Sequence, residues 1–309
     1  ESSAAGVDTE KVIERTEYTK LREQGYTVVD LKKEKPVVLK VPGKGKVFDE
    51  MKTWELVEKA DVLISVPVLK THDQTEVTLG MKNMKGLISD AHKKDFHRYG
   101  VVEGVVDMLT TFKPVVLTVI DGTVGQEGLG PIFGTPVPMD LIVASKDIVA
   151  ADAVGGKIIG YDPKDVPITV AAAARGLGEM DLEKIEIRGV SVESVARRFV
   201  RASETKIEGT PPFTLLFDEG TCTGCRNTVV SAIMDMKNQG LLSKLENKCI
   251  VCGPLEESKL PAGVTKDRLV LVGVCTKHLK EKGSFVQGCP PNNVYVVQAV
   301  VGEEVEKRY

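Results

Sequence analysis

The first 221 residues of this 309-residue chain contain no cysteine, and no apolar run approaches the ~18 residues of a membrane-spanning helix. A basic excess is absent as well. The formal net charge is −3, which argues against a general nucleic-acid-binding protein, because such proteins usually carry a strong positive charge. Apolar residues make up 42% of the sequence and charged residues 28%, the balance of a soluble globular protein. We therefore expect neither a membrane span nor a nucleic-acid partner.

The beginning of the sequence shows no leader segment. Position 1 is Glu rather than Met, and no charged stretch followed by an apolar one comes after it. We expect a chain that is mature, trimmed or incomplete at this end. Further along, the sequence contains no internal repeat and no low-complexity tract.

Strand-like and helix-like segments alternate along most of the chain, which predicts an α/β fold with a mostly parallel sheet and flanking helices. The length favours one large and one small domain, because 309 residues exceed one ordinary core. The polar segment 202–212 ends in Pro211-Pro212 and is the best linker candidate. We predict an α/β domain over residues 1–205 and a smaller α/β domain over residues 206–309.

The expected elements follow from hydrophobic periodicity and from turn residues. Helices are predicted over residues 8–24, 53–60, 101–112, 147–159, 168–176 and 226–240. Strands are predicted over residues 26–31, 36–41, 61–70, 115–120, 141–144, 185–188, 213–217, 248–252, 269–274 and 294–301. The run 61–70 is apolar enough for a strand buried on both faces.

Lysines and histidines concentrate between residues 70 and 98, where three of the four histidines of the chain lie. Lys70 and His72 come at the end of a predicted buried strand, at the edge where open α/β sheets bind ligands. Such side chains can hold a carboxylate or phosphate, or act as acid and base. We select Lys70, His72, Lys82 and His97 as catalytic candidates. Two alternatives remain open: a solvated basic helix face, and a metal site built from the three histidines, which lack a short ligand spacing.

A glycine-rich stretch begins at Asp121, directly after another predicted strand. Its glycines allow backbone amides to approach a ligand closely, and Asp121 and Glu127 add carboxylates. The spacing matches neither G-x-G-x-x-G nor a Walker loop, so we infer no nucleotide. We select Asp121, Glu127, Gly128 and Gly130 as cofactor- or ligand-binding candidates, with a tight structural loop as the alternative.

All six cysteines lie after residue 221, which indicates ligand chemistry in a reducing compartment rather than a disulfide framework. Cys222 and Cys225 form a C-x-x-C pair. Cys275 and Cys289 each follow a predicted strand or lie in a turn rich in glycine and proline. Four thiolates placed in this way can converge at one end of a sheet and hold an iron–sulfur cluster.

A second C-x-x-C pair, Cys249 and Cys252, leaves zinc open as an alternative. Together with the first pair it approximates the spacing of a zinc ribbon. However, Cys249 and Cys252 lie in a predicted strand, where residues three apart point to opposite faces. Two buried structural thiols are the plainer interpretation of this pair. A redox-active dithiol at the first pair is the third alternative.

Three motifs of the C-terminal region resemble the proximal-cluster motifs of the nickel–iron hydrogenase small subunit. They are Glu-Gly-Thr-Cys-Thr-Gly-Cys over 219–225, Val-Gly-Val-Cys over 272–275, and Gly-Cys-Pro-Pro over 288–291. In that family, the corresponding cysteines bind a 4Fe-4S cluster on a flavodoxin-like domain. The resemblance implies that Cys222, Cys225, Cys275 and Cys289 bind such a cluster.

This sequence also departs from the hydrogenase pattern. Arg226 and Asn227 replace the acidic and hydroxyl residues that usually follow the first motif, and no further cluster motif occurs. The paired C-x-x-C motifs that hold nickel and iron in the hydrogenase large subunit are absent from the chain. The resemblance therefore does not imply hydrogen chemistry by this chain alone.

The first two thirds of the chain resemble the domain of unknown function 362 family. Matching stretches occur over most of residues 20–190: 61–67, 70–72, 77–79, 82–83, 86–88, 97–98, 121–122, 127–131 and 150–153. The resemblance implies a fold and a site without supplying a reaction. We expect the chain to lack the upstream segment that members commonly carry. Many members bear a ferredoxin-type cysteine cluster in place of this C-terminal unit.

These patterns together predict a cytoplasmic iron–sulfur protein that binds one 4Fe-4S cluster. Its expected role is electron transfer or an oxidoreductase reaction, coupled to an anionic small molecule or a redox partner protein, and a low-potential cluster would suit an anaerobe. One alternative is a non-redox enzyme acting on a carboxylate or phosphate, with a structural 4Fe-4S or zinc centre. Another is a non-catalytic subunit that passes electrons to a larger partner. The substrate and a homo-oligomeric state stay open.

Overall fold

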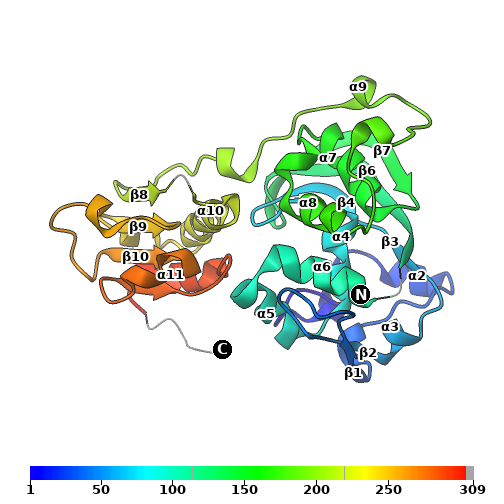
Figure 1. The fold of residues 1–309 in the computed structure, drawn as a ribbon, viewed down its shortest axis with the longest axis horizontal. Coiled ribbons are helices and arrows are strands. Elements are labelled where there is room, and N and C mark those ends of the chain that lie inside the picture. The colour runs from blue at the N-terminus through cyan, green and yellow to red at the C-terminus, as the bar shows by residue number, and fades with distance from the viewer. Residues whose placement is uncertain (113, 219, 304–309) are drawn as a thin grey trace.

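The computed structural model of the chain describes residues 1–112, 114–218 and 220–303. These residues form a larger and a smaller unit, which lie side by side in Figure 1. The larger unit contains strands β1 to β7, and the smaller unit contains β8 to β11 with helices α10 and α11. The predicted boundary after residue 205 lies in the connection between them, after the 3-10 helix η5 (Ala202–Glu204) and before β8 (Thr214–Phe217).

The larger unit is built on a five-stranded mixed sheet. Its strands are β3 (Leu63–Ser65), β4 (Val68–His72), β5 (Glu76–Thr78), β6 (Val115–Leu129) and β7 (Phe133–Ser145). β3 and β4 pair in parallel with different parts of the long β6, whereas β5 and β7 run antiparallel to β4 and β6. A separate antiparallel pair consists of β1 (Pro36–Lys40) and β2 (Glu50–Trp54). The predicted α/β class is confirmed, with more antiparallel pairing in this unit than expected.

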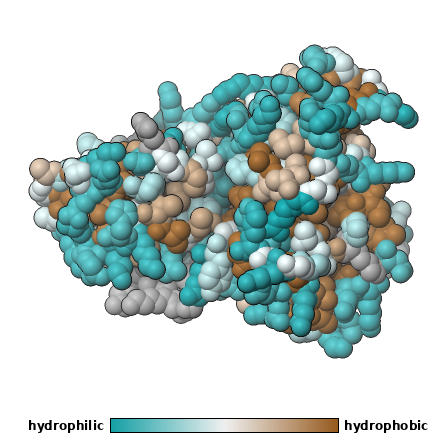
Figure 2. Space-filling model, in the orientation of Figure 1, coloured by the Kyte–Doolittle hydropathy of each residue, from teal (hydrophilic) through white to brown (hydrophobic). Residues whose placement is uncertain are grey.

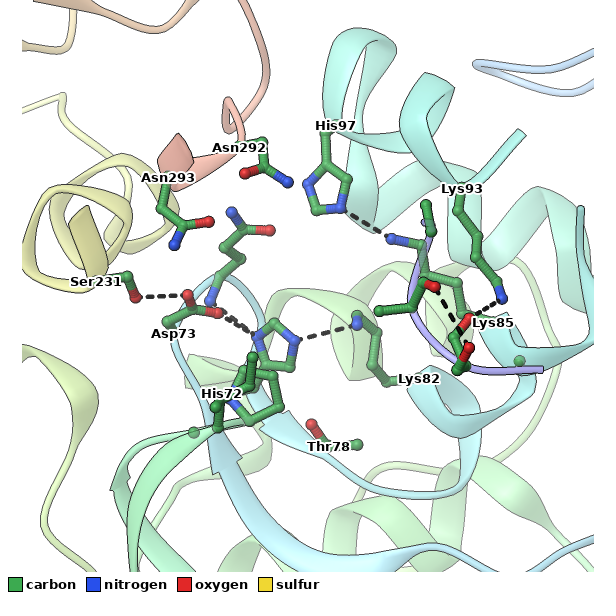
Figure 3. Close-up of a pocket in the computed structure, with 18 of the residues that line it drawn as sticks. His72, Asp73, Thr78, Lys82, Lys85, Lys93, His97, Ser231, Asn292 and Asn293 are labelled. Atoms are coloured by element: carbon green, nitrogen blue, oxygen red, sulfur yellow. Dashed lines mark hydrogen bonds and ion pairs between the residues drawn. The ribbon is translucent and has the colours of Figure 1, made fainter. Parts of the chain in front are cut away.

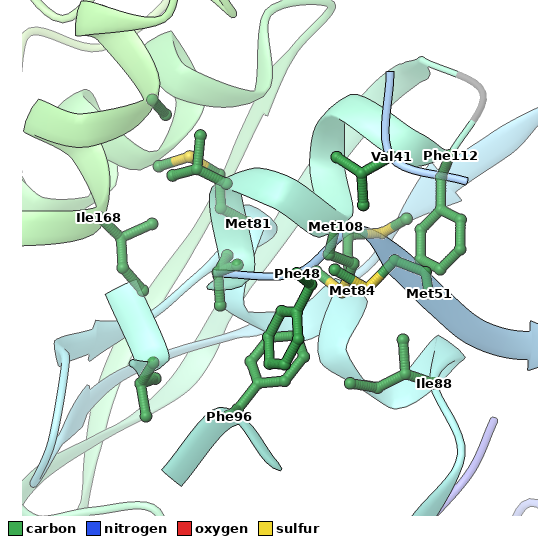
Figure 4. Packing of buried hydrophobic residues seen from close by; sticks show 14 of the residues in the cluster. Val41, Phe48, Met51, Met81, Met84, Ile88, Phe96, Met108, Phe112 and Ile168 are labelled. Atoms are coloured by element: carbon green, nitrogen blue, oxygen red, sulfur yellow. The ribbon is translucent and has the colours of Figure 1, made fainter. Parts of the chain in front are cut away.

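Helices cover this sheet and enclose a core rich in methionine and aromatic residues. They are α1 (Thr9–Arg15), α2 (Thr19–Glu23), α3 (Glu55–Lys59), α4 (Gly80–Asn83), the 3-10 helix η2 (Met84–Leu87), α5 (Asp90–Tyr99), α6 (Val101–Thr111), α7 (Ile148–Ile158), α8 (Pro167–Ala174) and α9 (Val192–Val195). Figure 4 shows Phe48 against Phe96, with Met51, Met84 and Met108 nearby. This core holds α4, η2 and α5 in place against the rest of the unit.

The smaller unit contains an all-parallel sheet in the order β8, β9 (Cys249–Cys252), β10 (Leu269–Val272) and β11 (Ser284–Val286). β9 and β10 are buried along their whole length, as their continuous apolar runs predict. Helices α10 (Thr223–Asn238) and α11 (Asn293–Val301) pack on each other and share a core with the sheet. The strand order is sequential, without the reversal that marks the flavodoxin fold.

Some predicted strands are absent. Residues 26–31 and 185–188, all within the described part of the chain, form no strand. The predicted strand 294–301 was wrong, because these residues form helix α11. A short run of valines fits a buried strand or a buried helix equally well, and here packing against α10 decided for the helix.

The apolar run 61–70 was also predicted incorrectly. Pro67 divides it into β3 and β4, since proline cannot donate a hydrogen bond to a neighbouring strand. One face of these strands is open to solvent, and Ile64 is 54% exposed.

Ile142 of β7 is 65% exposed, and hydrophobic surface gathers mainly on the larger unit in Figure 2. Within the described residues, none of the helices combines the length and apolar character needed to cross a membrane.

Asp152 of α7 fixes the start of α4. Its carboxylate accepts hydrogen bonds from the backbone N–H groups of Gly80 (2.6 Å) and Met81 (3.0 Å). A Cβ atom at position 80 would lie 2.9 Å from an Asp152 oxygen, so glycine permits this close approach. Burial raises the pKa of Asp152 to about 7, against the effect of the two hydrogen bonds. Asp152 thereby positions the helix that carries Lys82.

Replacing Asp152 with alanine should lower the free energy of unfolding of the larger unit by roughly 2–4 kcal/mol, because two buried N–H groups lose their acceptor. Urea unfolding followed by the fluorescence of Trp54, the only tryptophan of the chain and a buried one, measures this change. Glu186→Ala removes an exposed ion pair with Arg188 and serves as the control, with the transition almost unchanged. Similar shifts in both variants would contradict the role given to Asp152.

Candidate functional site

A cavity of about 480 Å³ lies where the larger unit faces the smaller one (Figure 3). Strand β4, helices α4 and α5, and η2 supply much of its wall, and residues of α10 and the start of α11 complete it. Five lysines and two histidines line the cavity, against the two carboxylates of Glu1 and Asp73. The basic residues are Lys70, Lys82, Lys85, Lys93, Lys94, His72 and His97. The cavity is therefore strongly electropositive.

Local spacing brings the basic residues of β4 and α4 to the same cavity. Lys70 and His72 lie two apart on β4 and therefore share one face of the strand. Lys82 and Lys85 lie one helical turn apart. The preceding residues, Met81 and Met84, are buried in the core, whereas Lys82 and Lys85 line the cavity.

Helix α5 contributes Lys93 and His97, which lie four residues apart on one face. His92 belongs to the opposite face, and its ring centroid lies 4.5 Å from that of Phe48. His92 is thus a core residue and does not line the cavity with His72 and His97.

A hydrogen-bonded chain crosses the floor of the cavity. The Nζ atom of Lys82 lies 3.1 Å from Nε2 of His72, and Nδ1 of His72 lies 2.8 Å from Oδ1 of Asp73. On the far side, the hydroxyl of Ser231 donates to Oδ2 of Asp73 at 2.6 Å. Ser231 belongs to α10, so the chain links the two units. His72, Asp73 and Ser231 are all buried.

Charge decides which nitrogen of His72 carries the proton. The negative Asp73 faces Nδ1 and the positive Lys82 faces Nε2, so we assign the proton to Nδ1. The backbone N–H of Gln74 donates toward the same Nδ1 at 2.9 Å, which by itself would favour a proton on Nε2. A neutral amide weighs less than the carboxylate at 2.8 Å and the ammonium group on the other side of the ring. In this arrangement Lys82 donates to His72, and His72 donates to Asp73.

Burial and mutual repulsion make the lysines of the cavity unusually weak bases. Burial lowers the pKa of Lys82 to about 8, with a further contribution from Lys70 and an opposing one from Asp73. Burial holds the pKa of Lys85 well below its ordinary value, and Lys82 and Lys93 lower it further. The pKa of Lys70 is also lowered by burial. A bound anion would offset this repulsion.

The two cavity histidines are held neutral for the same reasons. Burial lowers the pKa of His72 to about 4, and the charge of Lys82 acts in the same direction. Burial also holds the pKa of His97 well below its ordinary value, together with Lys85, whose Nζ lies 3.1 Å from Nε2 of His97. Both rings are therefore available as neutral hydrogen-bonding groups near neutral pH.

The N-terminal residues of the described chain form one wall of the cavity. The Nζ atom of Lys93 donates to the hydroxyl of Ser2 and to the carbonyl of Ser3, both at 2.6 Å. Burial lowers the pKa of Lys93 to about 8. Lys93 is therefore already engaged by oxygen atoms, whereas the Nζ atoms of Lys82 and Lys85 each lie against a histidine nitrogen.

The turn after β4 joins the cavity to the smaller unit. The side-chain amide of Gln74 donates to the hydroxyl of Thr228 and to the carbonyl of Pro291, both at 3.1 Å. The backbone N–H of Cys289 donates to the carbonyl of His97 at 2.8 Å, and the carbonyl of Cys289 accepts from Val101 at 3.2 Å. Cys289 is thereby fixed to the residue whose side chain lines the cavity.

The glycine-rich stretch after Asp121 is not a loop, because it continues strand β6 as far as Leu129. Asp121 binds the backbone and hydroxyl of Thr123, and Glu127 accepts from the backbone of Val200. Of the four residues predicted to bind a ligand here, only Gly130 lines the cavity, and Asp121, Glu127 and Gly128 do not.

Gly130 has a structural role that explains the glycine. A Cβ atom there would lie 2.1 Å from the carbonyl oxygen of Thr71, so β4 could not pass so closely. The carbonyl of Gly130 accepts a hydrogen bond from the backbone of Asp73 at 2.9 Å. Gly130 thus helps to hold Asp73 in the hydrogen-bonded chain.

The four cysteines predicted as ligands lie beyond the carboxyl ends of the parallel strands. Cys222 and Cys225 follow β8, at and just after the start of α10, Cys275 follows β10, and Cys289 follows β11. Because the strands are parallel, these segments meet at one edge of the sheet. Cys222, Cys275 and Cys289 are exposed, and Cys225 is buried.

These thiols influence one another's pKa, and Cys222 also raises the pKa of Cys252, after the larger effect of burial. The thiols of Cys222 and Cys275 both raise the pKa of Cys289, after the larger effect of burial. A hydrogen bond from Cys225 lowers the pKa of Cys222 to about 6, and the same pairing raises that of Cys225. A Cβ atom at Gly273 would lie 2.8 Å from Sγ of Cys225, so glycine leaves room at this edge.

The remaining pair, Cys249 and Cys252, occupies opposite faces of β9. Cys249 packs in the core cluster with Val251 and Leu271, whereas Cys252 packs in the cluster with Cys225. Both are buried, as predicted for structural thiols. Among the described residues, no three histidine, cysteine or carboxylate side chains stand ready around a single metal ion. A four-iron cluster instead takes one thiolate at each corner.

Sequence reasoning missed several residues of the cavity. Asp73 follows His72 directly and could have been found from the pairing of histidine with an adjacent carboxylate. Ser231, Asn292 and Asn293 belong to the smaller unit and carry no local signal of a contact with β4 or α5. Only the docking of the two units brings them to the cavity.

The chain is similar in part to known proteins. Its sequence is 33% identical over 138 residues to the thylakoid-associated protein sll1697 of Synechocystis sp.. The aligned region spans 42% of this chain and 42% of the relative, so the chain covers less than half of the relative's length. No solved structure matches the chain. Residues 1–157, just over half of the chain, match the family described as domain of unknown function (DUF362), and the protein therefore belongs to the DUF362 family.

Proposed function

We propose that this chain is an iron–sulfur protein that binds one 4Fe-4S cluster through Cys222, Cys225, Cys275 and Cys289. Beside the cluster, the lysine- and histidine-lined cavity binds an anionic small molecule. The expected role is electron transfer or an oxidoreductase reaction with a redox partner, in a reducing compartment such as the cytoplasm. The observation that carries the proposal is the placement of Cys289, which is hydrogen-bonded to His97 of the cavity through both of their backbones.

The donor set fits a cluster in its chemistry and in its position. Four thiols from three separate segments meet at the carboxyl edge of one parallel sheet, and three of them are exposed. The lowered pKa of Cys222 favours the thiolate form that iron requires. When bound, a 4Fe-4S cluster would accept and release single electrons.

The cavity fits an anion because its positive charges are not neutralised from within. Asp73 is occupied by His72 and Ser231, which leaves the ends of Lys82 and Lys85 without a carboxylate partner among the described residues. A carboxylate or phosphate between these two ends would stabilise both ammonium groups.

The cluster can be tested by purifying the full chain without oxygen. We expect about four iron and four sulfide per chain, with a broad visible absorption. Cys275→Ser should lose most of the iron, because it removes the ligand from one corner. Iron and sulfide analysis beside circular dichroism separates this loss from unfolding.

The matched control for the cluster is Cys249→Ser. Cys249 lies at the other end of β9 and packs in a different core, so this variant should retain its iron. Loss of iron from Cys249→Ser with retention in Cys275→Ser would mean that the wrong thiols were chosen. Stoichiometric zinc in a colourless protein would overturn the cluster altogether.

Anion binding can be measured by titrating inorganic phosphate into the full chain in a calorimeter. Lys85→Gln should weaken binding by at least about tenfold, because a charge-assisted hydrogen bond contributes roughly 1.5–3 kcal/mol. Lys157→Gln, an exposed lysine at the end of α7 outside the cavity, is the control and should bind as the wild type does. Equal affinities in all three proteins would refute the anion site.

A second function is favoured by the hydrogen-bonded chain from Ser231 to Lys82, which suits acid–base chemistry with a purely structural cluster. Phosphate distinguishes the two functions. If the sites are coupled, phosphate should shift the midpoint potential of the cluster to a more negative value, because a nearby negative charge disfavours the reduced cluster. Redox titrations with phosphate and with chloride at equal ionic strength measure the shift. A potential that is the same in both salts would favour the structural cluster.

A further inference from the structure

The geometry points to Lys82 as the residue that donates a proton to the bound anion, with Asp73 and Ser231 as positioning residues that act through His72. This inference rests on the anion site proposed above and deepens it. The substrate class is an oxyanion, a carboxylate or a phosphate ester, on which negative charge develops during the reaction.

The hydrogen bonds of the site run from Lys82 to His72 and from His72 to Asp73. With the proton of His72 on Nδ1, the lone pair of Nε2 accepts one N–H of Lys82 at 3.1 Å. An ammonium group has three N–H bonds, so one is held by His72 and others remain to meet an anion in the cavity. His72 thus orients Lys82 without taking its place as the donor.

Asp73, which supports His72, is itself held by several hydrogen bonds. Asp73 accepts from His72 and from Ser231, and its backbone N–H donates to Gly130 at 2.9 Å. Both carboxylate oxygens are therefore used, and Asp73 is 8% exposed. Burial alone would raise the pKa of Asp73, but His72 and Ser231 hold it below its ordinary value, so Asp73 stays negative.

Lys82 and the neighbouring lysines have different hydrogen-bond partners. Lys93 is engaged by Ser2 and Ser3, and Lys94 is exposed. Lys93 also lies 3.7 Å from a carboxylate oxygen of Asp90. Among the cavity lysines that the structure describes, Lys82 is the one that a histidine links to a buried carboxylate. The titratable groups around it, from every element that lines the cavity, are Lys70, His72, Asp73, Lys85, Lys93, Lys94, His97, Glu1 and Tyr295.

The proton passes directly from Lys82 to the bound oxyanion. One N–H bond of the Lys82 ammonium breaks, and its electron pair stays on nitrogen. The proton forms an O–H bond with the oxyanion, whose charge becomes one unit more positive, while Lys82 becomes a neutral amine. Water then returns a proton to Lys82, which restores the ammonium group, and the hydroxide ion formed leaves to solvent.

The inference can be tested by labelling the full chain with acetic anhydride over a range of pH. Only neutral amines react, so peptide mass spectrometry gives a titration midpoint for each lysine. In the wild type Lys82 should titrate near pH 8. In Asp73→Asn the midpoint should fall by about one unit, because the negative charge that favours the ammonium form is gone. Ser231→Ala should give a smaller fall in the same direction.

Lys157 of α7 is the internal control in every sample, and its midpoint should not move. Unchanged Trp54 fluorescence shows that a variant is still folded. Ser231→Ala provides a milder variant if Asp73→Asn is unstable. A Lys82 midpoint that is unaltered in both variants, or that lies near the ordinary lysine value in the wild type, overturns the inference.

Phosphate separates this inference from the proposed function. Added phosphate should raise the Lys82 midpoint in the wild type, because an anion favours the ammonium form. If phosphate has no effect while Asp73→Asn still lowers the midpoint, the anion site fails and the positioning role stands. If phosphate raises the midpoint but Asp73→Asn leaves it unaltered, the anion site stands and the positioning role is overturned.

Discussion

The hydrogen bond from Ser231 to Asp73 is the contact on which the arrangement of the site depends. It connects the turn after β4 to α10, whose first turn carries Cys222 and Cys225. The cavity and two of the four thiols are therefore connected by one helix, seen at the junction of the two units in Figure 1. Any movement of α10 changes the support of His72 and the position of Cys222 and Cys225 together. A shared rigid element of this kind is a physical route for coupling between two sites.

The concentration of positive charge in the cavity is unfavourable for the free energy of folding, and interactions elsewhere in the fold offset it. Lys82 and Lys85 repel each other, and burial disfavours both charges. The backbone of α4 is held in spite of this repulsion by Asp152, and Met81 and Met84 anchor the same segment in the core (Figure 4). Functional sites often contain charges in unfavourable surroundings, and packing elsewhere compensates for them.

Much of the basic cluster could be predicted, because strand and helix periodicity are local. Lys70 and His72 share a face at a spacing of two, and Lys82 precedes a second lysine by one turn. The misplaced elements had a different cause. The valines of α11 fit a strand or a helix, and the glycines after Asp121 fit a loop or a close strand crossing. Long-range packing determined the secondary structure of both segments, and the hydrophobic periodicity of the sequence carries no information about such packing.

The sequence by itself determined the α/β class, the set of cysteines beyond the strands and the basic character of the segment after residue 69, since each depends on residues close together in the chain. Tertiary structure alone decided that these features meet. Asp73 and Ser231 lie 158 positions apart, and Cys289 is hydrogen-bonded to His97 across an even longer separation. Contacts of this kind arise where the two units pack against each other, and their energies are spread over many residues. No local pattern in the sequence encodes them.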